Sequence, residues 1–266
     1  MKRTLGAAVI GMALLGGMLG CTTTTTTTTT RGANSDHKSS SADAASVNVQ
    51  LGVDYLRQGQ LALAQTKLER ALKEDSHNPD AHGALALLDE RLGKVDEADR
   101  EYRRALVLSR HSPSMLNNYA VYLCSHARPD EGVRYFEEAA TNPLYSTPWA
   151  AYTNAGVCLR AGHRDQDAMV RFNRALQANP AYAEAAYQAS DLDFSMQRDT
   201  QARERIDAFL MSNPATPDLL LLGWRIAQAQ ADIGGQSKYA YRLMHEFPKS
   251  QQTHAVQVAT ARAGSG

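Results

Sequence analysis

The sequence lacks the patterns that specify β-sheets and the commonest catalytic sites. It contains no sustained alternation of apolar and polar residues, so we expect no strands and predict an all-α fold. It has no glycine-rich phosphate loop, no Gly-x-Ser-x-Gly and no His-Glu-x-x-His motif. We therefore expect no enzymatic activity, no cofactor or metal, and no small-molecule substrate.

An excess of charge of either sign is also missing. The 28 Lys and Arg residues balance the 28 Asp and Glu residues, so the formal net charge is zero. This balance gives no electrostatic reason to expect a nucleic acid as partner. The eight histidines are scattered along the chain. Asp191 and Asp193 are two positions apart on an expected helix and so point in different directions. The titratable side chains therefore form no candidate catalytic site.

Cysteine is rare, and the first of the three cysteines ends a short apolar run. The first three residues carry two positive charges, and residues 5–19 are apolar over a length too short to span a bilayer comfortably. Gly20 and Cys21 end the run, and this arrangement resembles the signal of bacterial lipoproteins. The resemblance implies that residues 1–20 are removed and that Cys21 carries acyl chains, which suffice for stable anchoring. An ordinary secretory signal with an incidental cysteine is the alternative.

The segment after Cys21 has almost no large apolar side chain. It begins with nine threonines, Thr22–Thr30, and continues to residue 45 with small and polar residues. We predict that residues 21–45 form a disordered tether. The lipoprotein resemblance also implies an outer-membrane address, because Asp at the position of Thr22 favours inner-membrane retention in such proteins.

From Ser46 onward, residue types recur at intervals of 34. Five pairs share this spacing: Gly59 and Gly93, Ala64 and Ala98, Leu68 and Tyr102, Ala71 and Ala105, and Pro79 and Pro113. A period of 34 residues is that of the tetratricopeptide repeat, a pair of antiparallel helices that stacks on its neighbours. We predict a right-handed superhelix of about six repeats over residues 46–250, starting near residues 45, 79, 113, 149, 183 and 217. A two-residue insertion precedes the fourth repeat, and residues 251–266 are predicted to be a flexible tail.

Small and large residues occupy fixed positions within each repeat. In repeat 1, Gly52, Ala64 and Ala71 are the small residues at positions 8, 20 and 27, and Leu68 is the large one at position 24. Small residues let the two helices approach closely, and the large residue fills the gap that they leave. Glycine near position 15, such as Gly59, permits a left-handed turn between the helices.

The two remaining cysteines lie in consecutive repeats. Cys124 and Cys158 occupy the first helices of repeats 3 and 4, and first helices of neighbouring units run side by side in such a stack. An exported protein is in an oxidising environment. We therefore predict a disulfide between them, worth roughly 3–4 kcal/mol in the chain-entropy model. Two buried free thiols that never meet are the alternative.

An apolar stripe is predicted along the inner surface of the stack. First-helix positions 2, 5, 9 and 12 line this surface in tetratricopeptide stacks, and position 9 is apolar in four consecutive repeats, ending with Val157. We predict a groove for an apolar or amphipathic partner helix or strand, formed by Val49, Val53, Leu56, Leu87 and Val121. The alternative is that these residues pack against the second helices of the same stack.

Several stretches resemble the type IV pilus biogenesis and stability lipoproteins called PilF or PilW. They are residues 117–124 (NNYAVYLC), 142–148 (NPLYSTP), 154–158 (NAGVC), 220–226 (LLLGWRI) and 247–250 (FPKS). The likeness covers roughly residues 46–250 and the lipoprotein signal, and it includes the insertion after repeat 3. It is therefore more specific than a generic helical repeat.

The resemblance implies a pilotin. Such a protein sits on the periplasmic face of the outer membrane and helps secretin subunits to reach that membrane and assemble into the ring through which the pilus passes. It also implies that Val49, Val53 and Leu56 form the docking surface. Two other classes remain open, namely a general periplasmic adaptor for cell-envelope or outer-membrane assembly complexes and a regulatory subunit of an enzyme.

Overall fold

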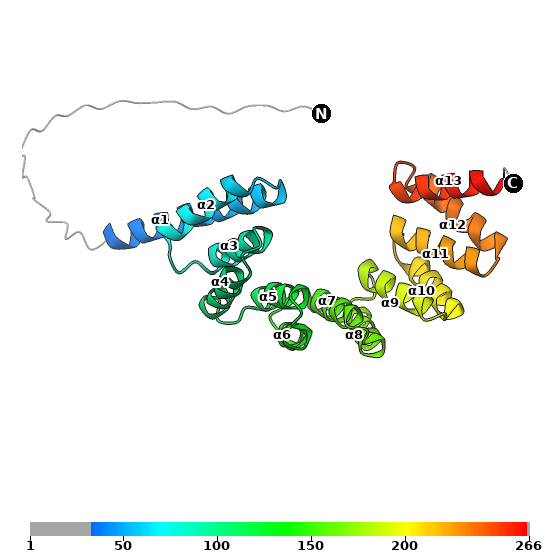
Figure 1. The fold of residues 1–266 in the computed structure, drawn as a ribbon, viewed down its shortest axis with the longest axis horizontal. Helices are drawn as coiled ribbons and strands as arrows, with labels where there is room; N and C mark the ends of the chain where they lie inside the picture. Colours follow the sequence, from blue (N-terminus) through cyan, green and yellow to red (C-terminus); the bar gives the residue numbers. More distant parts are fainter. Residues whose placement is uncertain (1–32, 265–266) are drawn as a thin grey trace, which may run out of the picture. The chain divides into compact units, whose positions relative to one another are not determined.

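The computed structural model describes residues 33–264, and the side chains of residues 41–261. Within this part all regular secondary structure is helical (Figure 1). The helices are α1 (Ala33–Arg57), α2 (Leu61–Glu74), α3 (Pro79–Arg91), α4 (Val95–Leu108), α5 (Pro113–Ser125), α6 (Pro129–Thr141), α7 (Pro148–Ala161), α8 (Asp165–Ala178), α9 (Ala183–Ser195), α10 (Asp199–Ser212), α11 (Pro217–Ala229), α12 (Ile233–Glu246) and α13 (Gln251–Gly264). Among the described helices, none combines the length and the hydropathy that a membrane span needs. The predicted signal, Cys21 and the threonine run lie outside the described residues.

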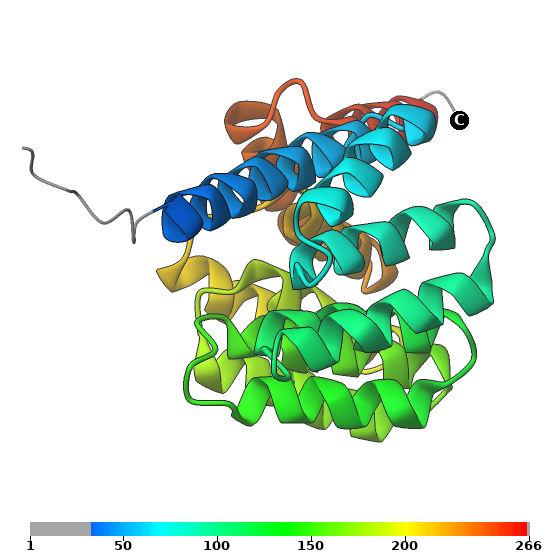
Figure 2. The same ribbon diagram turned by 90° about the vertical axis from the view of Figure 1, so that its left-hand side faces the viewer.

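The described residues from Ser41 onward belong to one compact unit. Within it, consecutive helices pack as pairs. The second helix of each pair also packs against the first helix of the next, as α2 does with α3 and α6 with α7. Figures 1 and 2 show the neighbouring pairs side by side. Helices α3, α5, α7, α9 and α11 begin at, or one residue from, the predicted repeat starts. The predicted all-α tetratricopeptide fold is confirmed.

The turn inside each pair contains one residue with left-handed backbone geometry. Gly59 and Gly93 occupy this position in the first two pairs, each with φ of 73°. The later pairs use residues with a side chain at the same position, with φ between 54° and 60°: Ala127, His163, Gln197 and Ala231. Glycine adopts this conformation without the steric cost of a Cβ atom. The backbone geometry of this turn is therefore the same in every pair, although only the first two pairs have glycine there.

The close approach of paired helices depends on small residues that face large ones. A Cβ atom at Gly52 would lie 2.6 Å from Cδ2 of Leu68, and one at Gly156 would overlap the ring of Phe172. The alanines at positions 20 and 27 are fully buried, as Ala64 shows. Positions 8 and 24 of a repeat thus form a matched pair in the core, as the sequence pattern predicts.

The disulfide predicted from the repeat register is present. It joins Cys124 in α5 to Cys158 in α7, with the Cα atoms 5.7 Å apart. A Cβ atom at Gly132 in α6 would lie 2.9 Å from the carbonyl oxygen of Ala120, so the absence of a side chain there lets α6 pack close beside the bridge. The bridge links repeats 3 and 4 across the insertion between α6 and α7.

The two ends of the helical region differ from the predicted bounds. α1 begins at Ala33, inside the segment predicted to be a disordered tether. Residues 251–264, predicted to be a flexible tail, form α13. Val256 is fully buried and Thr253 is almost so, because α13 packs against α11 and α12 and covers the apolar face that the last pair would otherwise expose. A solenoid needs such a terminal cap, and a few apolar residues among polar ones are enough to form it.

Candidate functional site: a groove between three first helices

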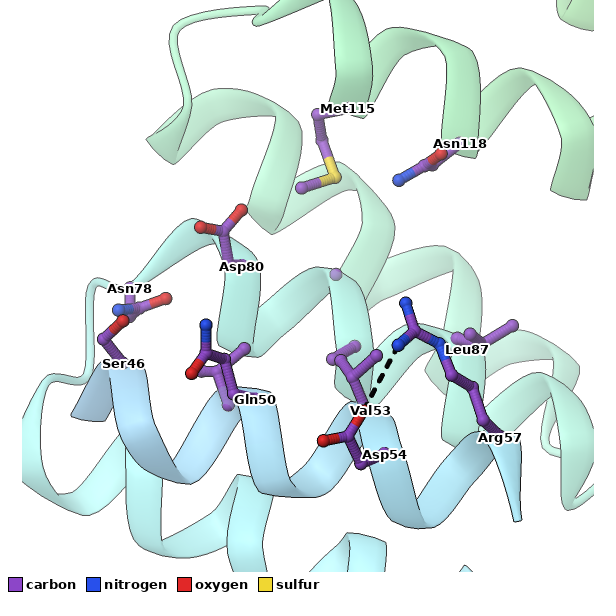
Figure 3. A pocket seen from close by; sticks show the side chains of 13 residues that line it. Ser46, Gln50, Val53, Asp54, Arg57, Asn78, Asp80, Leu87, Met115 and Asn118 are labelled. Carbon is purple, nitrogen blue, oxygen red and sulfur yellow. Dashed lines mark hydrogen bonds and ion pairs between the residues drawn. The ribbon is translucent and has the colours of Figure 1, made fainter. Parts of the chain in front are cut away.

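A groove of about 720 Å³ lies between the first helices of repeats 1 to 3. Its lining comes from α1, α3 and α5 (Figure 3). The residues are Ser46, Val49, Gln50, Val53, Asp54, Arg57, Asn78, Asp80, Gly83, Ala84, Leu87, Met115 and Asn118. The first helices of consecutive repeats lie on one side of the stack and form the inner surface that first-helix positions 2, 5, 9 and 12 predict.

Aliphatic and thioether groups line the middle of the groove, together with the exposed side chain of Gln50. Val53 and Leu87 are partly buried and pack against the core cluster of the first two repeats. A Cβ atom at Gly83 would lie 2.8 Å from Cε of Met115, so the bare backbone of α3 gives room for the methionine side chain of α5. Methionine is flexible and polarizable, and it adapts to apolar partners of different shape.

Polar side chains occupy the two ends of the groove. Ser46, Asn78 and Asp80 lie at the end of the groove where α3 begins, and Arg57 and Asn118 lie at the other end (Figure 3). Nη1 of Arg57 is 3.2 Å from Oδ1 of Asp54, and both side chains are exposed. The site is therefore a trough of mixed lining, which offers apolar side chains and hydrogen-bonding groups to a bound segment.

Three of the five predicted groove residues line this cavity. They are Val49, Val53 and Leu87. The prediction for Leu56 is wrong, because this side chain is 1% exposed and packs in the core with Leu68 of α2 and with residues of α3. Val49 is also largely covered, at 8% exposed, so it contributes to the floor rather than to the open wall.

Val121 is exposed, at 47%, but it does not line this cavity. It lies on α5, beyond the residues of that helix that close the groove. The predicted stripe therefore divides into a concave part in repeats 1 and 2 and an exposed part further along the stack.

Several groove residues escape the search for apolar side chains. Asp80 and Gly83 occupy positions 2 and 5 of repeat 2, which the same position rule assigns to the inner surface. Asn118 and Met115 come from position 6 and position 3 of repeat 3. A reading of all inner positions, polar ones included, would find Asp80 and Gly83 but not the other two.

A cluster of charged and hydrogen-bonded side chains lies elsewhere, between repeats 2 and 3. Asp99 accepts hydrogen bonds from Tyr119 at 2.8 Å, from Arg128 at 2.7 Å and from Arg103 at 2.6 Å. Burial raises the pKa of Asp99, but these three donors outweigh burial and hold its pKa below the usual range. Burial and the bond to this carboxylate raise the pKa of Tyr119 to about 12. Tyr119 and Arg128 tie Asp99 of α4 to the next repeat, and Arg103 pairs with it within α4, so we interpret the cluster as structural.

The two neighbouring aspartates of α9, Asp191 and Asp193, likewise form ion pairs with other helices. Asp191 lies 2.7 Å from Arg160, and Asp193 lies 3.1 Å from Arg205, so each carboxylate has its own partner. Among the described residues, no group of three or more His, Cys, Asp or Glu side chains could hold a metal ion. Within this part of the chain, the groove is the feature best suited to a partner.

Comparison with known proteins agrees with the repeat architecture. The tetratricopeptide repeat family model matches residues 55–113. The type IV pilus assembly protein PilF of Pseudomonas aeruginosa is 29% identical over 208 residues, which cover 78% of this chain and 82% of PilF.

Two solved structures share the fold over most of their length. A Pseudomonas aeruginosa PilF structure matches with a TM-score of 0.63 at 28% identity, over 83% of this chain and 99% of the PilF chain. The structure of PilW, described as a widely conserved type IV pilus biogenesis factor, matches with a TM-score of 0.62 at 28% identity, over 80% and 98% of the two chains. The chain is therefore a tetratricopeptide-repeat protein homologous to PilF and PilW.

Proposed function

We propose that this protein acts in type IV pilus biogenesis as an outer-membrane lipoprotein and pilotin for the secretin. Homology to PilF, a type IV pilus assembly protein, and to PilW, a type IV pilus biogenesis factor, supports the process. In this proposal the protein binds a secretin segment in its groove, brings the subunit to the outer membrane and promotes its multimerisation. It acts by binding and catalyses no reaction.

The groove between α1, α3 and α5 is the observation that carries the proposal. Val53 and Leu87 are only partly buried, and they face an open cavity of about 720 Å³. Apolar side chains of a partner would remove this surface from water, which favours binding by about 25 cal/mol for each Å² of apolar area. The NH2 group of Asn78, whose amide oxygen already accepts a bond from Ala81, and the amide of Asn118 can hydrogen-bond to the backbone of the same segment.

The first experiment tests the groove in cells. A strain without the gene is complemented with the full-length protein that carries Val53→Asp and Leu87→Asp. Secretin multimers are then followed on gels and motility in a twitching assay. We expect the multimers to be lost, because two carboxylates in place of Val53 and Leu87 would have to be desolvated by an incoming apolar segment. Both side chains are only partly buried, so the fold should persist, and circular dichroism of the purified variant checks this.

A matched variant keeps the number of new charges constant. Val107→Asp and Met211→Asp replace two exposed apolar side chains, 71% and 86% exposed, that do not line the groove. This protein should restore multimers as the natural chain does. Normal multimers with the groove variant, at a normal protein level, would contradict the proposal and would favour a general periplasmic adaptor role.

The proposed location depends on the N-terminal sequence, which lies outside the described residues. A Cys21→Ser protein should lose incorporation of labelled palmitate and leave the membrane fraction. A Thr22→Asp protein should keep the label and move to the inner-membrane fraction. Unchanged fractionation of both proteins would overturn the proposed lipid anchor and would not affect the proposal that the groove binds a secretin segment.

A further inference from the structure

The groove carries an uneven distribution of charge along its length. Asp80 lies at the end of the groove where α3 begins, beside Ser46 and Asn78 (Figure 3). At the opposite end Arg57 and Asp54 are 3.2 Å apart, so their charges compensate each other. Asp80 forms no ion pair within the described part of the chain. One uncompensated negative charge therefore marks one end of the trough.

We propose that the groove selects a protein segment that carries Lys or Arg beside its apolar side chains, with the cation placed at Asp80. This inference rests on the proposed function, because it assumes that the groove binds a segment of another protein. Val53 and Leu87 would contact the apolar side chains, and the carboxylate of Asp80 would receive the cation. The two kinds of contact lie at different places along the trough, so they also fix the direction in which the segment binds.

The expected size of the charge effect follows from the exposure of the site. Asp80 is on the exposed rim, so an ion pair there is worth little on its own. Replacing the partner's cation by an acid exchanges an attraction for a repulsion, and we expect a difference of roughly five- to tenfold in affinity. Apolar burial thus supplies most of the affinity, and Asp80 supplies the preference.

Asp80 also has a structural explanation, since it lies in the first turn of α3 after Pro79. A carboxylate there stabilises the helix N-terminus. A variant of Asp80 alone cannot separate the two roles. Ser46 gives a second variant, because it lines the same end of the groove from α1 and lies outside the first turn of α3. Ser46→Lys therefore cancels the charge at this end without touching the α3 N-terminus.

The chain also contains a control for Asp80 at the equivalent repeat position, Asp218, whose carboxylate accepts a hydrogen bond from Gln252 of α13. Asp218 follows Pro217 in the first turn of α11, as Asp80 follows Pro79 in α3, and it is exposed but far along the chain from the groove. Asp218→Lys makes the same change at the equivalent repeat position. Any effect of a new lysine on general peptide capture should appear in this variant too.

The experiment selects peptides from a displayed random library of 15-residue segments on immobilised full-length protein. Peptides that still bind the variant with Val53→Asp and Leu87→Asp are discarded, so the remainder depends on the groove. Sequences selected by the natural protein and by Asp218→Lys should combine apolar residues with Lys or Arg. Sequences selected by Asp80→Lys should carry Asp or Glu instead, and those selected by Ser46→Lys should lose the preference for cations. Affinities of a Lys peptide and its Glu counterpart, measured by fluorescence anisotropy, should differ five- to tenfold in the expected direction.

Two other results would overturn the inference and are distinguishable. Groove-dependent peptides that show no charge preference, or a preference that Asp80→Lys and Ser46→Lys leave unchanged, would refute the role of Asp80 and leave the proposed function standing. Failure to recover any peptide that depends on Val53 and Leu87 would count against both the role of Asp80 and the proposed function, because the groove would then bind no peptide segment of this length.

Discussion

Reducing the disulfide between Cys124 and Cys158 should destabilise the stack by about 3–4 kcal/mol. The two residues are 34 positions apart, and a cross-link of that span removes this much loop entropy from the unfolded chain in the chain-entropy model. For a chain of this size each kcal/mol corresponds to roughly 2–4 °C, so the midpoint of thermal unfolding should fall by about 10 °C.

The assay compares thermal unfolding by circular dichroism with and without a phosphine reductant. Mass spectrometry after alkylation checks that reduction is complete. The double variant Cys124→Ser and Cys158→Ser should unfold near the midpoint of the reduced natural protein and should not respond to reductant. Repeats stabilise one another mainly through neighbours. Hydrogen exchange should therefore rise in α5–α8 and much less in α11–α13.

An unchanged midpoint in fully reduced protein would refute this reasoning. It would show that the insertion before α7 is held by packing alone and that the unfolded chain gains little freedom. If reduction instead lowered the protection from hydrogen exchange evenly over all helices, the result would contradict the nearest-neighbour description of the stack.

Three further predictions concern the fold. Gly156→Ala should destabilise the protein by about 1–2 kcal/mol in urea unfolding, because overlap with Phe172 outweighs the gain in helix propensity, whereas Gly234→Ala should be neutral or stabilising. Gly93→Ala should cost about 1 kcal/mol, since φ is 73° there; an unchanged urea midpoint would contradict this. The lowered pKa of Asp99 stabilises the fold above the unfolded value near 3.9, and this contribution is lost as pH falls through the folded pKa. The stability difference between the natural protein and Asp99→Asn should therefore shrink below about pH 4, and a constant difference would refute the assignment.

The repeat architecture can be predicted from the sequence because its determinants are local. Gly52 contacts Leu68 in the other helix of the same pair, and Gly156 contacts Phe172 in the same way. The disulfide follows from the register as well, because first helices of consecutive repeats run side by side. A period therefore predicts which residues face one another without any knowledge of the distant chain.

The depth of the groove depends on distances that a period does not contain. Val49 and Leu56 lie on one face of α1, seven positions apart, yet only Val49 reaches the cavity, because Leu68 and residues of α3 cover Leu56. Periodicity gives the direction of a side chain but not how closely the next helix passes. The contribution of Met115 from α5 escapes prediction for the same reason.

The central claim is that the groove between α1, α3 and α5 holds a segment of the secretin, and crosslinking from inside the groove tests it most directly. A photoreactive amino acid replaces Gln50, which lines the groove and is exposed, in full-length protein made in cells that assemble pili. Gln177 on α8 gives an exposed control position outside it. We predict a secretin adduct from position 50 that disappears when Val53→Asp and Leu87→Asp are added, and none from position 177. Equal secretin adducts from both positions, or none from position 50 while multimers form normally, would contradict the account.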